Sequence, residues 1–146
     1  MRIVLDTNVV LSALLWRGKP YRLLEAICQR SDVRLFSSPA LLDELADVLA
    51  RASPTKQLAV IGRSAREVMA DYIAVIEIVE PVDVPRVVPT DADDDHVIAA
   101  AVTAGATLIV SGDSDLLSMG NHQGIDILSA AMAVEKIGDK DARSEI

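Results

Sequence analysis

The sequence predicts a three-layer α/β/α fold in which helices cover both faces of a central, mainly parallel sheet of about five strands. Short apolar segments rich in β-branched residues alternate with longer amphipathic segments along the chain. Two of the apolar segments, 2–6 (RIVLD) and 107–113 (TLIVSGD), end on an aspartate. The composition is 51% hydrophobic but only 3% aromatic, which indicates a globular chain with an aliphatic core.

The first elements follow this alternation. Segment 37–51 has the clearest helical pattern, because Ser38 suits the N-cap, Pro39 suits the first turn, and leucines recur at helical spacing. The predicted elements of this half are strand 2–6, helices 9–16 and 20–30, strand 33–36 and helix 37–51.

In the remainder, glycines and prolines mark the boundaries. Gly62 closes one helical segment, and three prolines make 81–94 a loop in which only 86–88 has an extended pattern. Segment 64–80 begins with a helical pattern and ends in a β-branched run that is typical of a strand. The remaining predicted elements are helices 53–62 and 94–105, strands 107–113 and 124–129, and helix 129–138.

The length of 146 residues fits one domain, which we expect to span 1–138, with a poorly ordered tail at 139–146. The apolar N-terminal run is interrupted by Asp6 and Asn8 and is too short to span a bilayer, so we expect a cytoplasmic protein without a membrane partner. The single cysteine, Cys28, is expected on the buried face of its helix.

The charge is unevenly distributed along the chain. Its net value of −8 argues against a polyanionic partner, but residues 17–66 hold nine Lys or Arg against five Asp or Glu. Residues 67–126 hold twelve acids and one base. The first part could therefore contact phosphates while the second holds cations.

The acidic residues predict a metal site. Asp6 and Asp113 follow strands of one parallel sheet, so we expect them at the same edge, where helix-borne Glu44 and Asp95 and the nearby Asp115 can join them. Crowded carboxylates repel one another, and a divalent cation removes that penalty. An all-oxygen ligand set suits Mg²⁺ or Mn²⁺, and metal-assisted phosphodiester hydrolysis is the chemistry it favours.

Four segments together resemble the PIN-domain family, which includes the VapC-like toxin ribonucleases of toxin-antitoxin pairs. These segments are IVLDTNVV, SSPALLDEL, DADDDHVIAAAVTAGATLIVSGDSDLL and GIDILS. The resemblance covers the chain to about Gly138 and implies a PIN-like, Rossmann-like fold. It also implies a metal-dependent endoribonuclease that cuts single-stranded RNA with one or two Mg²⁺ or Mn²⁺ ions and leaves 5′-phosphate and 3′-hydroxyl ends. An antitoxin encoded nearby and a homodimer are the implied partners.

The resemblance also assigns residues. Its catalytic acids fall on Asp6, Glu44, Asp95 and Asp113 or Asp115, and we favour Asp113. The expected metal ligands are Asp6, Glu44, Asp95, Asp113 and Asp115. Thr7, Asn8 and Ser111 match polar positions that support the carboxylates or position water.

Some residues near this motif have simpler explanations. Asp91 and Asp93 are expected to be solvated charges that interact favourably with the helix dipole, and Asp94 stays open as a contact to metal-bound water. His96 is expected at the surface or as a cap, and His122 in a loop. Of the basic residues, the candidates for phosphate contact are Arg17, Lys19, Arg51 and Lys56. Trp16, Tyr21 and Phe36 are interpreted as core or edge packing, with no stacking aromatics evident.

Two other functional classes remain open. The chain could be a non-catalytic PIN-fold module for protein contact, although none of the expected acids is missing. It could also be a phosphohydrolase on another α/β fold with an aspartyl nucleophile. The second class fits less well, because no aspartate follows Asp6 at a spacing of two residues.

Overall fold

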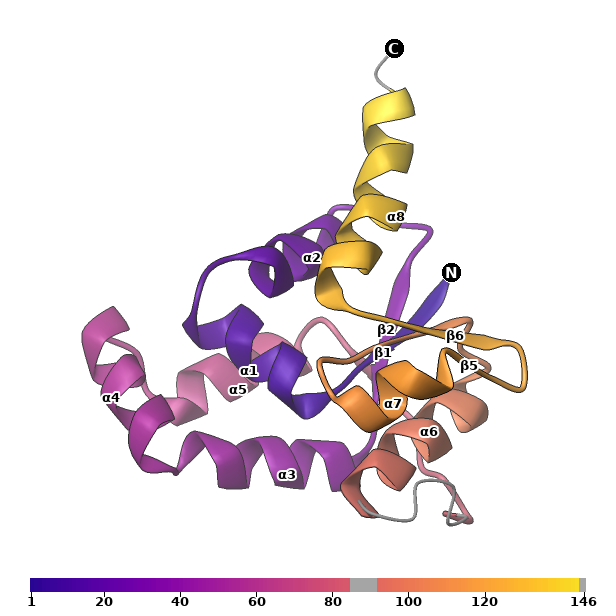
Figure 1. Cartoon of the computed structure of the whole chain (residues 1–146). Helices are drawn as coiled ribbons and strands as arrows, with labels where there is room; N and C mark the ends of the chain where they lie inside the picture. Colours follow the sequence, from indigo (N-terminus) through magenta and orange to yellow (C-terminus); the bar gives the residue numbers. More distant parts are fainter. Residues whose placement is uncertain (85–91, 145–146) are drawn as a thin grey trace.

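A six-stranded sheet lies at the centre of the molecule, with helices on both of its faces (Figure 1). The computed structural model describes residues 1–84 and 92–144. The strands are β1 (Arg2–Leu5), β2 (Arg34–Ser37), β3 (Glu77–Ile78), β4 (Leu108–Val110), β5 (Asn121–His122) and β6 (Ile125–Leu128). The helices are α1 (Thr7–Leu15), α2 (Lys19–Cys28), α3 (Pro39–Leu49), α4 (Ala52–Ile61), α5 (Ala65–Ile73), α6 (Ala92–Ala104), α7 (Ser114–Met119) and α8 (Ala130–Ser144).

The sheet has the order β3-β2-β1-β4-β6-β5. Every neighbouring pair is parallel except the β5–β6 hairpin. The predicted α/β class with a mainly parallel sheet is therefore confirmed. The sheet has one strand more than expected because His122, assigned to a loop from the sequence, pairs with Ile125 in that hairpin.

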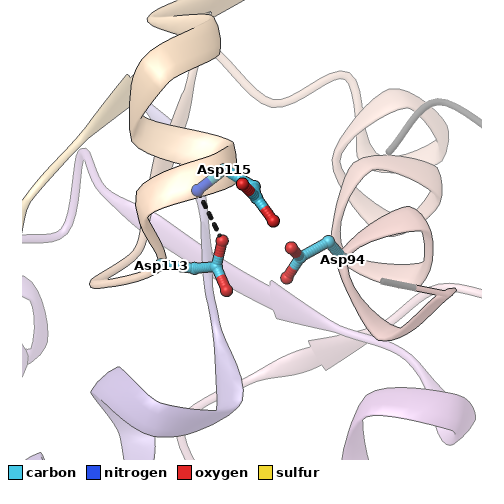
Figure 2. Close-up of side chains that lie close together, drawn as sticks. All are labelled: Asp94, Asp113 and Asp115. Atoms are coloured by element: carbon cyan, nitrogen blue, oxygen red, sulfur yellow. Dashed lines mark hydrogen bonds between the residues drawn. The ribbon is translucent and has the colours of Figure 1, made fainter. Parts of the chain in front are cut away.

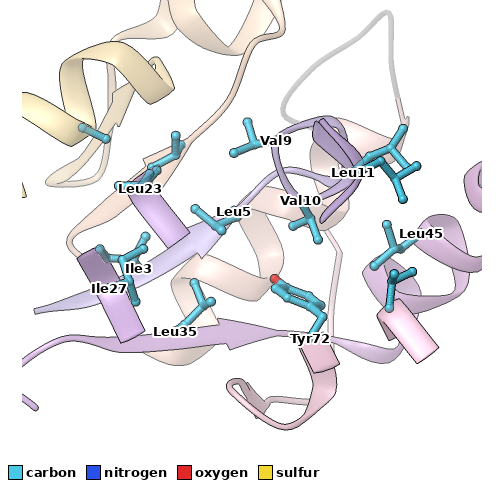
Figure 3. Packing of buried hydrophobic residues seen from close by; sticks show 14 of the residues in the cluster. Ile3, Leu5, Val9, Val10, Leu11, Leu23, Ile27, Leu35, Leu45 and Tyr72 are labelled. Atoms are coloured by element: carbon cyan, nitrogen blue, oxygen red, sulfur yellow. The ribbon is translucent and has the colours of Figure 1, made fainter. Parts of the chain in front are cut away.

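Two apolar layers hold the helices to the sheet. On one face, α1, α2, α5 and α8 pack against inward residues of β1 and β2, with Leu23, Ile27 and Tyr72 deeply buried (Figure 3). On the other face, α6 packs against β1, β2 and β4 through its own small side chains and through Val4, Phe36 and Ile109 of the strands. Alternate residues of each strand thus enter opposite layers, as the pleat of a buried sheet requires.

Several boundaries differ from the sequence analysis. Helix α7 was not predicted, and it follows β4 directly because Asp113 caps its first turn. Helix α8 continues past Gly138 to Ser144, so residues 139–144 of the expected tail are helical. The expectations for Asp91 and for 86–88 lie outside the described residues, as does the side chain of Asp93.

The prediction that Cys28 is buried is wrong, because its side chain is exposed. Leu23 and Ile27 are one turn apart and form the buried face of α2. The residue after Ile27 is rotated by about 100° around the helix, which takes the thiol off that face. Within the part of the chain that the structure describes, no helix has the length and apolarity needed to cross a membrane.

Alanines allow α6 to approach the sheet closely. Ala99, Ala100, Ala101 and Ala104 are each at most 3% exposed. A larger side chain in a well-packed layer forces strained rotamers or backbone shifts.

We therefore expect Ala100→Leu to lower the free energy of unfolding by about 1–3 kcal/mol, as measured by urea denaturation. The matched control is Val102→Leu, whose side chain lies on the exposed side of α6 and should change stability by less than about 0.5 kcal/mol. Equal effects of the two changes would contradict the assigned packing of α6.

Candidate active site

The site is built on the parallel pairing of β1 with β4. Leu5 lies opposite Val110 in the register, and the Asp6 amide donates a hydrogen bond to the Val110 carbonyl at 2.9 Å. The next residues along the two strands, Asp6 and Ser111, therefore emerge side by side at the carboxyl edge of the sheet. This edge is where an open parallel sheet binds ligands.

Ser111 connects the acidic groups of the two strands. Its side chain is fully buried, and its Oγ donates to Asp6 Oδ2 at 2.7 Å. The same oxygen accepts a hydrogen bond from the Asp113 amide at 3.0 Å. Asp6 itself is only 6% exposed, so this hydrogen bond holds a largely buried carboxylate in one orientation.

Asp113 begins helix α7 as its N-cap. Its Oδ1 accepts hydrogen bonds from the Asp115 amide at 2.8 Å and from the Leu116 amide at 3.3 Å. The cap fixes the direction of the Asp113 carboxylate and places Asp115 in the first turn of the same helix.

Three carboxylates meet between α6 and α7. One oxygen each from Asp94, Asp113 and Asp115 lies within 4.8 Å of the other two (Figure 2). Asp94 comes from the first turn of α6 and is buried, Asp113 is half-buried and Asp115 is exposed. The group is therefore anchored in the protein on one side and reaches solvent on the other, as a site for an ion and a substrate must.

The other predicted acids lie outside this trio, as far as the described residues show. Asp6 and Asp95 are buried and Glu44 is half-buried on α3. The sequence predicts Asp95 as the ligand and leaves Asp94 open, whereas the structure brings Asp94 to Asp113 and Asp115. Successive residues of a helix point about 100° apart, and a run of adjacent aspartates does not reveal which one faces α7.

The predicted supporting residues differ in exposure. Thr7 is buried beside Asp6, and its Oγ1 has no hydrogen-bond partner among the described residues. Asn8 is exposed at the start of α1. His96 is half-buried, and its side chain lines a small cavity with Ser38 and Pro39 at the start of α3.

The four predicted phosphate contacts are exposed and lie on two elements. Arg17 and Lys19 lie at the α1–α2 junction, and Arg51 and Lys56 lie at α4. Of the four, Arg17 lines a hollow together with Gln57 of α4, the residue that follows Lys56.

Because Ser111 serves both Asp6 and Asp113, we expect Ser111→Ala to lower the free energy of unfolding by about 1–3 kcal/mol. The change removes the hydroxyl that donates to the buried Asp6 carboxylate and accepts from the Asp113 amide. Chemical denaturation measures this loss, with Ser118→Ala, an exposed serine of α7, as the matched control. A loss no larger than that of the control would contradict the bridging role.

Comparisons with known proteins identify the family of the chain and relatives of its fold. The family model described as "PIN domain" matches residues 2–115, and PIN domains are generally nucleases. A search of curated proteins finds no significant match.

Two solved structures share the fold at low identity. One is the crystal structure of VapBC2 from Rickettsia felis bound to a DNA fragment from their promoter, with a TM-score of 0.62, 13% identity, and coverage of 87% of this chain and 97% of that chain. The other is the crystal structure of PAE2754 from Pyrobaculum aerophilum, with a TM-score of 0.58, 14% identity, and coverage of 95% and 90%. The match to the family model covers most of the chain, and the chain therefore belongs to the PIN domain family.

Proposed function

We propose that this protein is a metal-dependent endoribonuclease that hydrolyses phosphodiester bonds of single-stranded RNA. The observation that carries the proposal is the trio of carboxylates at the sheet edge, Asp94, Asp113 and Asp115. Membership of a family whose members are generally nucleases supports the same reading.

The residues present fit a divalent cation. Three carboxylates so close together repel one another, and the positive ends of α6 and α7 offset only part of this repulsion. All the donor atoms are oxygens, which suits Mg²⁺ or Mn²⁺. The buried Thr7 hydroxyl, which has no hydrogen-bond partner among the described residues, is a further oxygen suited to a bound water near Asp6.

In this proposal Asp94, Asp113 and Asp115 hold one or two Mg²⁺ or Mn²⁺ ions. Asp6, Glu44 and Asp95, which the sequence also predicts as metal ligands, are the other acids of the site. When bound, the cation lowers the pKa of a water molecule and offsets charge on the phosphate. Ser111 keeps the Asp6 carboxylate oriented, and the α7 cap keeps Asp113 oriented. The exposed Arg17, Lys19, Arg51 and Lys56 would attract the phosphate backbone.

The first test is binding of the metal alone. We expect Mn²⁺ to raise the melting temperature of the wild-type protein, because a ligand bound only by the folded state stabilises it, by about 2.7 kcal/mol at one hundred times its dissociation constant. Asp113→Asn should reduce the shift while its amide oxygen still caps α7.

Asp94→Asn tests the role of Asp94, which the sequence leaves open. It should reduce the Mn²⁺ shift as Asp113→Asn does, whereas Asp47→Asn, an exposed acid on α3, should not. A full shift in both site variants would refute the proposed metal ligands.

The second test is catalysis. Purified protein with Mg²⁺ or Mn²⁺ should cut single-stranded RNA and leave 5′-phosphate ends, and removal of the metal by EDTA should stop the reaction. Asp6→Asn and Asp113→Asn should each reduce the single-turnover rate by about 10²- to 10³-fold, with Asp47→Asn again as the control. RNA left intact by a folded, metal-loaded wild-type protein would favour the non-catalytic interaction module.

The cleavage reaction also distinguishes the proposed nuclease from a phosphohydrolase on another α/β fold. A phosphohydrolase with an aspartyl nucleophile would accumulate a covalent phospho-enzyme, detectable by mass spectrometry after acid quenching. The proposed metal-assisted hydrolysis forms no bond between protein and phosphate.

The structural likeness to a VapBC protein supports a place in a toxin-antitoxin pair, with this chain as the cytoplasmic toxin, an antitoxin encoded nearby and a homodimeric toxin. Co-expression with the product of an adjacent small reading frame tests the pairing. A stable complex that no longer cuts RNA is the expected outcome.

A further inference from the structure

A wide hollow lies at the far end of α1 from the acidic site. Its volume is about 610 Å³, and it opens between the end of α1, the start of α2 and the helix α4. The side chains that determine its chemistry are Leu14, Trp16, Arg17, Tyr21, Gln57 and Ile61.

The hollow offers flat surfaces and a fixed polar group. The Arg17 guanidinium lies over the Tyr21 ring, 4.9 Å from its centroid, and Trp16 is half-buried beside it. Gln57 Nε2 donates to the Leu15 carbonyl at 3.0 Å, which holds the amide in place and orients its oxygen as an acceptor. Aromatic rings and arginine planes are the surfaces on which nucleobases stack, and a fixed amide can bind a base edge.

A second hollow is lined both by residues of α1 and α2 and by residues of the acidic edge. It has a volume of about 190 Å³ and is lined by Asn8, Ser12 and Pro20 and by Ser111 and Gly112, which directly precede Asp113. Ser12 is followed by Ala13, and Pro20 by Tyr21, so the walls of the two hollows are consecutive residues of α1 and α2. The helix α1 has nine residues and spans about 13 Å, a distance that a strand of a few nucleotides can cover.

The charge along this path suits a polyanion. Arg17 lines the wide hollow, the exposed Lys19 directly precedes Pro20 of the second hollow, and none of the described residues that line either hollow is an acid. Arg63 at the rim of the wide hollow is paired with Glu67 and Asp71, whereas no described acid is shown against Arg17 or Lys19. A chain with a net charge of −8 thus presents cations beside its aromatic surfaces here.

We propose that the RNA strand runs from the scissile phosphate along the α1–α2 junction, an inference that rests on the proposed ribonuclease function. A flanking base then stacks in the wide hollow on Tyr21 and Arg17. The narrow hollow accommodates the intervening sugar and phosphate beside Asn8 and Ser12. The wide hollow is then a substrate-positioning subsite separate from the carboxylates.

The chain contains a built-in probe for this subsite, because Trp16 is its single tryptophan. In EDTA, titration with a short oligouridylate should change Trp16 emission in a saturable way. Tyr21→Leu keeps apolar bulk but removes the ring, and we expect it and Arg17→Gln each to weaken binding about tenfold. Tyr21→Phe should bind like wild type, and Arg66→Gln, an exposed arginine on α5, should also leave the affinity unchanged.

Cleavage provides an independent readout. Tyr21→Leu should raise the KM for a long single-stranded RNA about tenfold while its rate at saturating RNA stays within twofold of wild type. A dinucleotide too short to reach the hollow should be cut equally by both proteins.

RNA that binds with unchanged Trp16 emission and with the same affinity in Tyr21→Leu would overturn the subsite. Emission that responds to an antitoxin but not to RNA would overturn it as well, and would identify the hollow as a protein-docking surface. RNA that changes the emission and is never cut with Mg²⁺ or Mn²⁺ would support the subsite and reject the nuclease. RNA that is cut but does not change the emission would support the nuclease and reject the subsite.

Discussion

The site depends on the parallel pairing of β1 with β4. This pairing takes Asp6 from one end of the sequence and Ser111 from near the other and sets them side by side at one sheet edge. Both strands are buried on their two faces by the helical layers, so their register cannot shift without exposing apolar residues. The position of the Asp6 carboxylate is therefore as secure as the core itself.

At this edge, local features of the helices place the acids. The Asp113 cap starts α7 and carries Asp115, and the alanine-rich α6 approaches the sheet closely enough for Asp94 to reach them. Each feature uses ordinary local chemistry, either an N-cap or small side chains at a helix-sheet contact. Their combination concentrates negative charge where two helices begin, and the helix dipoles make that concentration easier to fold.

Acidic and basic residues gather in different regions of the molecule. The acids gather at α6 and α7, while Arg17 and Lys19 lie at the α1–α2 junction with Tyr21. Such a division is compatible with a polyanionic substrate in a protein of acidic composition, because the field near a groove depends on local charges more than on the net charge. Trp16 and Tyr21, which the sequence assigns to packing, line an open hollow.

The amino-acid sequence alone determined the fold class and the family. Strand-helix alternation, the caps at Ser38 and Gly62, and the aspartates after two strands are local or periodic features, and local features can be read from one chain. The same is true of the prediction that Asp6 and Asp113 lie at one edge, which follows from parallel topology. The prediction from sequence was wrong where the direction of a side chain around a helix axis matters, as with Cys28, which is exposed.

Tertiary structure decided which side chains meet. It brought Asp94 to Asp113 and Asp115, tied Asp6 to Ser111 across the strand pair, and opened the hollow in which Arg17 covers Tyr21. The physical reason is that these contacts depend on how helices are turned against the sheet and against one another. That orientation results from packing of the whole core, and no short stretch of sequence contains it.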